Sequence, residues 1–230
     1  MRRRRSGRQA RERWVWGRTA AVARLLSSQV GMAAITPRAE RIIDLVELRR
    51  GGRYLDIGCG TAAYAHMLAQ MAGHAEPPVT MDITPGPGPV DLVGWPEKLP
   101  FRDQSFDHLT CLYYVRRWDD DVVHALGEEI SRVLAPGGTA LVMEVAPVVS
   151  DGLNRLHTRL LGAGCAEVDL RGWGRLAALF TECGFGAIDL VNVGPFFFPP
   201  IPRVGVLLRQ FPAEYLAQLE GETGEAAESP

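Results

Sequence analysis

Residues 53–62 read RYLDIGCGTA, a short apolar run that ends in a glycine loop. A continuous apolar run of this length is typical of a buried strand. Gly58 and Gly60 permit the tight turn that follows, because glycine adopts backbone angles closed to other residues. Apolar residues then recur at helical spacing as far as Gly73, at positions 62, 65, 68, 71 and 72. The stretch therefore predicts a strand, a glycine loop and a helix.

The same alternation extends in both directions from this stretch. An N-cap and a proline at Thr36-Pro37 open an earlier helix, which Gly51-Gly52 ends. Further strands are predicted at 79–83, 91–93, 106–113, 139–145, 188–193 and 204–208, and helices at 119–134, 151–161 and 173–183. Strands alternating with helices indicate an α/β domain with a doubly wound, mainly parallel sheet, whose ligands bind beyond the carboxyl ends of the strands.

Two connections in this pattern are unusual. Only seven residues separate Ile83 from Asp91, whereas a parallel crossover needs about a dozen, so we expect a thinly covered sheet edge there. Pro136-Gly137-Gly138 is interpreted as the turn that ends one helix before the next strand.

Length and composition fit one globular domain. The chain has 230 residues, 47% of them hydrophobic and 23% charged, with a net charge of −2. Residues 1–18 hold eight arginines and one acid, which leaves 17 basic and 26 acidic side chains in the remainder, a net charge of −9. An acidic body argues against nucleic-acid binding by the folded part, since phosphate contacts need a basic face.

The ends of the chain are expected to lie outside the domain. We predict a basic, disordered arm over residues 1–35, a domain over 36–210 and a C-terminal tail over 211–230. Met32 precedes the first predicted helix, so residues 1–31 are also interpreted as the product of an over-called start codon. A targeting segment and a nucleic-acid arm are the alternatives.

The cysteines and the hydropathy pattern bear on the compartment. Cys59, Cys111, Cys165 and Cys183 form no C-x-x-C pair and no dense disulfide framework, which favours a reducing, cytoplasmic setting and no metal site. No run of about 18 apolar residues that could span a bilayer is present.

The glycine loop by itself leaves two interpretations open. Gly58, Gly60 and Ala63 satisfy the dinucleotide-binding pattern, with Asp82 about 20 residues further on, so an NAD(P)-dependent oxidoreductase is one hypothesis. Asp56 argues against it, because a carboxylate two residues before the loop would repel a pyrophosphate but suits a ligand with a cationic amino group.

Four segments together resemble the class I S-adenosylmethionine-dependent methyltransferases of the small-molecule, UbiE-like type. They are LDIGCGT at 55–61, the acid Asp82 at the end of the second strand, EKLPFRDQSFD at 97–107 and RVLAPGGTAL at 132–141. The resemblance spans roughly residues 50–146. It implies a Rossmann-like sheet of seven strands with an antiparallel last strand, S-adenosylmethionine as cofactor, and methyl transfer to a small acceptor.

The resemblance also implies cofactor-binding residues. Asp56 would accept from the amino group and Asp82 from the ribose hydroxyls, and the set is completed by Gly58, Cys59, Gly60, Ile83, Leu112, Trp95 and Glu97. Trp95 stands where the family usually has an aspartate that binds the adenine amino group. Substitution by Glu97 and stacking of Trp95 on adenine are the two alternatives.

Methyl transfer needs mainly alignment of the reacting atoms, and a base only if the acceptor must lose a proton. Where many relatives carry a histidine after the fourth strand, this chain has Arg117. The catalytic candidates are therefore Tyr113, Tyr114, Glu144 and His157. Arg116 and Arg117 are candidates for holding an acidic acceptor. Residues 196–201 are expected to line an acceptor pocket or a homodimer contact, and a protein that binds the cofactor without catalysis is a third hypothesis.

Overall fold

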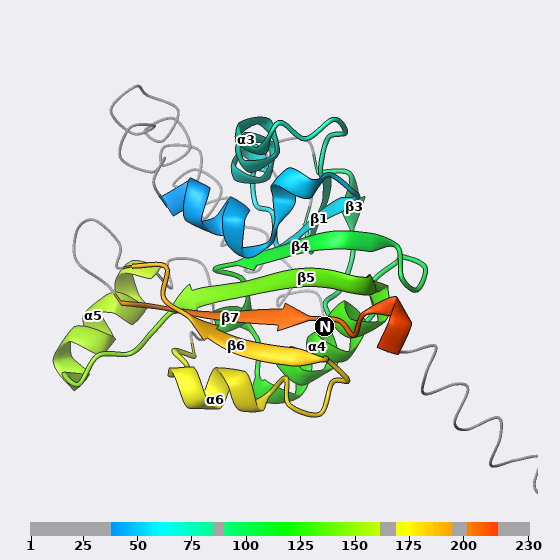
Figure 1. The fold of residues 1–230 in the computed structure, drawn as a ribbon. Helices are drawn as coiled ribbons and strands as arrows, with labels where there is room; N and C mark the ends of the chain where they lie inside the picture. Colours follow the sequence, from blue (N-terminus) through cyan, green and yellow to red (C-terminus); the bar gives the residue numbers. More distant parts are fainter. Residues whose placement is uncertain (1–37, 85–89, 162–168, 195–201, 216–230) are drawn as a thin grey trace, which may run out of the picture.

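The computed structural model describes residues 38–84, 90–161, 169–194 and 202–215 (Figure 1). The basic arm, the Thr36-Pro37 cap, Cys165, the apolar segment 196–201 and the end of the tail lie outside the described residues. Among those described, residues 38–45 are helical and a 3-10 helix, η1, spans Leu48–Arg50.

A seven-stranded sheet forms the centre of the described chain, in the order β3-β2-β1-β4-β5-β7-β6. The strands are β1 (Tyr54–Ile57), β2 (Val79–Asp82), β3 (Leu92–Val93), β4 (Phe106–Leu112), β5 (Leu134–Val145), β6 (Ala187–Val191) and β7 (Arg203–Arg209). The first five are parallel, while β7 runs antiparallel to both β5 and β6. The predicted doubly wound sheet with an antiparallel last strand is confirmed.

Register brings the carboxyl ends of the central strands to one edge. Ile57 of β1 is opposite Met81 of β2 on one side and Cys111 of β4 on the other. Because β7 is antiparallel, its first residue, Arg203, lies opposite Val145 at the end of β5. Residues distant in sequence therefore meet at this edge.

Helices cover both faces of the sheet (Figure 1). Residues 38–45 and α3 (Ala63–Ala72) pack on one face, in a core that includes Ile42, Leu68 and Leu141. On the other face lie α4 (Asp120–Val133) and α6 (Trp173–Ala178), whose apolar residues join a second core. A further helix, α5 (Asp151–Leu161), lies beyond the carboxyl end of β5.

Two predicted boundaries were wrong by five residues each. β5 begins at Leu134 instead of Thr139, because Pro136-Gly137-Gly138 lies within an irregular stretch of the strand, where the register with β4 shifts. Helix α6 ends at Ala178 instead of Cys183, because the next turns use tighter bonds, such as Phe180 N to Ala177 O at 3.0 Å. These turns place the buried Phe180 ring and the Cys183 thiol against Gly127 of α4.

The far edge of the sheet is exposed, as predicted from the short connection after β2. Both residues of β3 are exposed. Within the residues that the structure describes, no helix is long and apolar enough to cross a membrane. Three of the four cysteines, Cys59, Cys111 and Cys183, are free thiols.

Candidate active site

Backbone hydrogen bonds attach the glycine loop after β1 to the neighbouring strand β2. The amides of Gly58 and Cys59 both donate to Met81 O, at 2.8 and 3.1 Å. Gly58 has φ +73°, and a Cβ at this position would overlap the ring of Tyr114. Gly60 has φ +59°, but the space where its Cβ would point is open. The ring of Tyr114 therefore covers the loop at Gly58, whereas the space beside Gly60 is open.

Asp82, at the end of β2, is 2% exposed and lies beside this loop. Its Oδ2 accepts from Gly60 N at 2.9 Å and its Oδ1 from Ile83 N at 2.7 Å. Burial raises the pKa of Asp82, although these amides and the charge of Arg117 act in the opposite direction. The carboxylate is oriented by the loop and held where water is scarce.

Asp56, one strand away, is 6% exposed. Its Oδ1 accepts from the hydroxyl of Thr110 on β4 at 2.5 Å, and that hydroxyl is 2.7 Å from Tyr54 Oη. Burial raises the pKa of Asp56 to about 7; the Thr110 hydrogen bond acts to lower this pKa and the charge of Asp82 to raise it further. A cation beside Asp56 would offset the free-energy cost of burying its charged form.

Tyr113 follows β4 in the left-handed conformation, with φ +59°, which costs a non-glycine residue about 1 kcal/mol or more. Its amide donates to Met143 O at 2.8 Å, and its hydroxyl contacts Arg203 Nη1 at 2.9 Å. Burial raises the pKa of the Tyr113 phenol, while Arg203 acts to lower it. Sequence reasoning missed Arg203, because only the antiparallel β7 brings it to this edge.

Glu144 is fully buried near the end of β5 and is already hydrogen-bonded. Its Oε1 accepts from Arg116 Nη1 at 3.1 Å and Val145 N at 2.9 Å, and its Oε2 accepts from Arg116 N at 3.1 Å. The Arg116–Glu144 pair therefore fixes the loop after β4. Because both side chains are engaged in this pair, each is less available to bind an acceptor.

Trp95 and Glu97, the two alternatives for binding adenine, have different surroundings. Trp95 is 54% exposed, and its ring packs in a T-shaped arrangement with the Trp118 ring at a centroid distance of 6.3 Å. Glu97 is also exposed. Ile83 and Leu112, next to the ends of β2 and β4, are half-buried apolar residues.

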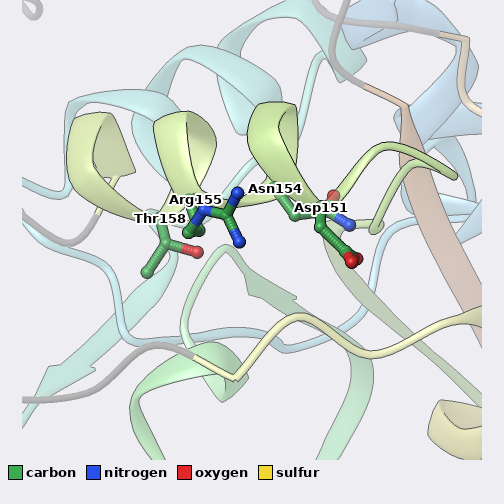
Figure 2. Close-up of a pocket in the computed structure, with 4 residues that line it drawn as sticks. All are labelled: Asp151, Asn154, Arg155 and Thr158. Atoms are coloured by element: carbon green, nitrogen blue, oxygen red, sulfur yellow. The ribbon is translucent and has the colours of Figure 1, made fainter.

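Helix α5 carries the remaining candidate, His157, which is buried with no hydrogen-bond partner for Nδ1 among the described atoms. The helix start is locked by Asn154, whose side chain bonds Val148 N at 2.8 Å and Val148 O at 2.7 Å. A hollow of about 410 Å³ is lined by Asp151, Asn154, Arg155 and Thr158, which project from one side of the helix (Figure 2).

The structure thus brings most of the predicted residues together. Asp56, the glycine loop, Asp82 and the two tyrosines lie at the ends of the neighbouring strands β1, β2 and β4. Trp95 contacts Trp118, which in turn contacts Tyr114, Glu97 is exposed, and His157 comes from α5. No cluster of three or more metal-ligating side chains occurs among the described residues.

Comparisons with known proteins fit this arrangement. Residues 55–142 match the family model of a methyltransferase domain. In fold, the described architecture resembles a protein from Pyrococcus horikoshii, PH0226, with a TM-score of 0.58 at 16% identity over 80% of this chain and 93% of that one. It also resembles human N-acetylserotonin methyltransferase in complex with S-adenosylmethionine, with a TM-score of 0.56 at 16% identity over 81% of this chain and 58% of that one.

The glycine loop, the acidic strand ends and the matched domain together identify the chain as a class I S-adenosylmethionine-dependent methyltransferase of the small-molecule type. Among its relatives is the demethylmenaquinone methyltransferase of Geobacillus kaustophilus, 28% identical over 69% of this chain and 80% of the relative. The chain is accordingly an enzyme that uses S-adenosylmethionine to methylate a small molecule. The oxidoreductase and non-catalytic hypotheses find no support in these matches.

Proposed function

We propose that Asp56, the loop 58–60 and Asp82 hold S-adenosylmethionine, and that the acceptor lies between Tyr113 and helix α5. The observation that carries this proposal is the pair of buried carboxylates at adjacent strand ends with open space at Gly60 between them. A cationic amino group beside Asp56 would favour its charged form. Asp82 accepts from the amides of Gly60 and Ile83, and the amide of Thr84 also acts on it. A carboxylate has about four acceptor positions, so Asp82 retains capacity to accept from a ribose hydroxyl.

On the adenine side, the proposal assigns stacking to Trp95 instead of hydrogen bonding to Glu97. The exposed indole rests against Trp118 and so offers a supported flat surface. Ile83 and Leu112 supply apolar contacts near the strand ends, and Cys59 contributes the backbone of the loop.

When bound, S-adenosylmethionine supplies a methyl group on a positively charged sulfur that needs no further activation. The chain's part is to align the acceptor with it, with reacting atoms about 3–3.5 Å apart, and to exclude water. Tyr114, packed on Gly58, places an aromatic ring beside the loop, where it can attract a cation.

We assign removal of the acceptor proton to Tyr113, because the guanidinium of Arg203 contacts its hydroxyl and acts against burial, which raises the pKa of this phenol overall. Glu144 is less suited, because Arg116 and Val145 already donate to its two oxygens. His157 is the alternative base, with one ring nitrogen unpaired among the described atoms.

For the acceptor, the named relative makes demethylmenaquinone the first compound to test. The hollow under α5 has a volume in the range of small-molecule sites. Its hydrogen-bonding lining suits the oxygen atoms of an acceptor.

The proposal extends to the setting of the enzyme. Free thiols at Cys59, Cys111 and Cys183 support a cytoplasmic location, and the net charge of −9 beyond residue 18 supports a folded part that binds no nucleic acid. The exposed apolar residues Leu153 and Leu156 on α5, and Val149 just before it, support a homodimer, which light scattering would detect.

The decisive experiment is calorimetry with S-adenosylhomocysteine, the demethylated product. We expect micromolar binding by the natural chain and a loss of about tenfold or more for Asp82→Ala. Asp189→Ala, which breaks an exposed ion pair with Arg209 on the outer strands, is the control and should bind normally. No binding by the natural chain would refute the proposed cofactor site. Mass spectrometry of demethylmenaquinone incubated with enzyme and cofactor tests the acceptor separately.

A further inference from the structure

The largest fully buried side chain in the described structure is a charged one, Arg171, which is 1% exposed. Charged side chains are rarely buried to this degree unless they are paired and fully hydrogen-bonded. Arg171 lies in the segment between α5 and α6, and the proposed reaction does not use it. Its burial therefore calls for a role that the site itself does not explain.

The contacts of Arg171 lead to the loop after β4. Nη1 donates to Val115 O at 3.1 Å and Nη2 to Trp118 O at 2.7 Å. These carbonyls belong to the 3-10 helix η2 (Val115–Arg117) and to the residue that ends it. A single-turn helix of this kind has too few internal bonds to hold its own shape.

The guanidinium also pairs with two carboxylates on either side of that loop. Nε lies 2.8 Å from Asp120 Oδ1, at the start of α4, and Nη2 lies 3.2 Å from Asp169 Oδ2. Asp169 in turn donates its amide to Arg116 O at 2.9 Å. Three parts of the chain, η2, the start of α4 and residues 169–171, are thus joined through one buried cation.

The loop that Arg171 holds forms one wall of the cofactor site. Tyr114, immediately before η2, packs its ring on Gly58 so closely that no side chain could fit there. Arg117, within η2, is near enough to Asp82 to lower its pKa. A shift of η2 would move both residues away from the glycine loop.

We propose that Arg171 is a positioning residue for methyl transfer: it clamps η2 so that Tyr114 stays against Gly58 and the cofactor cradle keeps its shape. This inference rests on the proposed cofactor site. It assigns no contact between Arg171 and the cofactor or the acceptor, and its whole effect passes through the loop after β4.

The neighbouring Arg175 provides a matched control. It binds the same two carboxylates, with Nη2 lying 2.8 Å from both Asp120 Oδ2 and Asp169 Oδ2, but it is 50% exposed and donates to no carbonyl of η2. Replacing Arg175 removes a comparable ion pair and leaves the clamp in place. Comparing variants of Arg171 and Arg175 therefore separates positioning of the loop from general electrostatic stabilisation.

The test measures S-adenosylhomocysteine affinity by calorimetry, with circular dichroism to establish folding. Arg171→Met is expected to weaken binding about tenfold or more, and Arg171→Lys nearly as much, because an ammonium group cannot reach all these acceptors at once. Arg175→Met should bind within about twofold of the natural chain. Millimolar guanidinium should restore part of the affinity of Arg171→Ala, whereas equal sodium chloride should not.

A double-mutant cycle with Tyr114→Ala distinguishes positioning from stability alone. If Arg171 acts through the ring of Tyr114, its replacement should cost little further affinity once that ring is gone. Additive losses, or natural affinity in folded Arg171→Met, would overturn the inference. If Arg171→Met does not fold, the lysine variant and the guanidinium experiment decide. Failure of the natural chain to bind would instead refute the proposed cofactor site.

Discussion

Asp56 is deeply buried and belongs to the proposed cofactor site, so its ionisation should govern cofactor binding. Its pKa is raised to about 7 in the free protein, mainly by burial. Binding a cationic amino group requires the charged form, so the affinity should fall by up to about tenfold for each pH unit below this pKa. A ligand that stabilises the carboxylate must therefore displace a proton below that pH.

We expect the affinity for S-adenosylhomocysteine to rise about tenfold between pH 6 and pH 8, with proton release at the lower pH. The sign follows from the raised pKa: protonated Asp56 dominates below pH 7 and ionised Asp56 above it. Burial also raises the pKa of Asp82, so its protonation would act in the same direction. Calorimetry in buffers of different ionisation enthalpy measures the protons. A flat profile for the natural chain, or one unchanged in Asp56→Asn, would contradict this assignment.

The two glycines of the loop should fail in different ways. At Gly58 a methyl group would collide with the Tyr114 ring, so Gly58→Ala should destabilise the fold by about 2–4 kcal/mol, from overpacking and a positive φ together. At Gly60 the space is open, so Gly60→Ala should cost only about 1 kcal/mol of stability. Its methyl group would instead enter the cofactor cradle and abolish binding. Urea unfolding and calorimetry on both variants check this contrast; equal loss of stability would argue against it.

Among the helices, α5 has its polar side toward a hollow and leaves Leu153 and Leu156 exposed. Most amphipathic helices of a globular domain have the opposite arrangement. Side chains with hydrogen-bonding groups beyond the carboxyl end of β5 are what an acceptor site would use, whereas the proposed cofactor-binding carboxylates lie on β1 and β2.

Arg155→Ala on α5 should therefore raise the KM for the acceptor about fivefold to tenfold while leaving the Kd for S-adenosylhomocysteine unchanged. Steady-state kinetics with any accepted methyl acceptor, beside calorimetry, separates the two constants. Asp189→Ala, which breaks an exposed ion pair on β6 and β7, is the control and should leave both constants unchanged. Equal changes in KM and Kd for Arg155→Ala would place the residue with the cofactor instead.

Binding should be visible in the stability of the entire domain, because the site draws on several strands at once. At a hundredfold excess over Kd, a ligand that binds only the folded state adds about 2.7 kcal/mol of stability. For a domain of this size, that corresponds to a rise in Tm of about 5–10 °C. S-adenosylhomocysteine should produce this rise in a thermal melt, and NAD at the same concentration should not. A higher Tm with NAD alone would return the oxidoreductase hypothesis to consideration.

Much of this molecule could be predicted from local sequence. The strand, glycine loop and helix at 53–73 follow from hydrophobic periodicity and from the backbone freedom of glycine, both of which act within a few residues. The same holds for Asp56 and Asp82, since their distance from the loop along the chain places them at strand ends. Boundaries such as Thr139 and Cys183 were wrong because packing against neighbouring elements decided them.

The sequence by itself determined the order of strands and helices along the chain, the glycine loop, and the positions of Asp56 and Asp82 at strand ends, because short-range patterns encode them. Only the tertiary structure decided the contact of Arg171 with Val115, the contact of Arg203 with Tyr113, the ion pair of Arg116 with Glu144, and the packing of Tyr114 on Gly58. Each of these contacts joins residues 28 or more positions apart, and such pairs form only when the sheet order brings their elements together. A long-range contact leaves no periodic signal in the chain, so the geometry of the folded sheet alone reveals it.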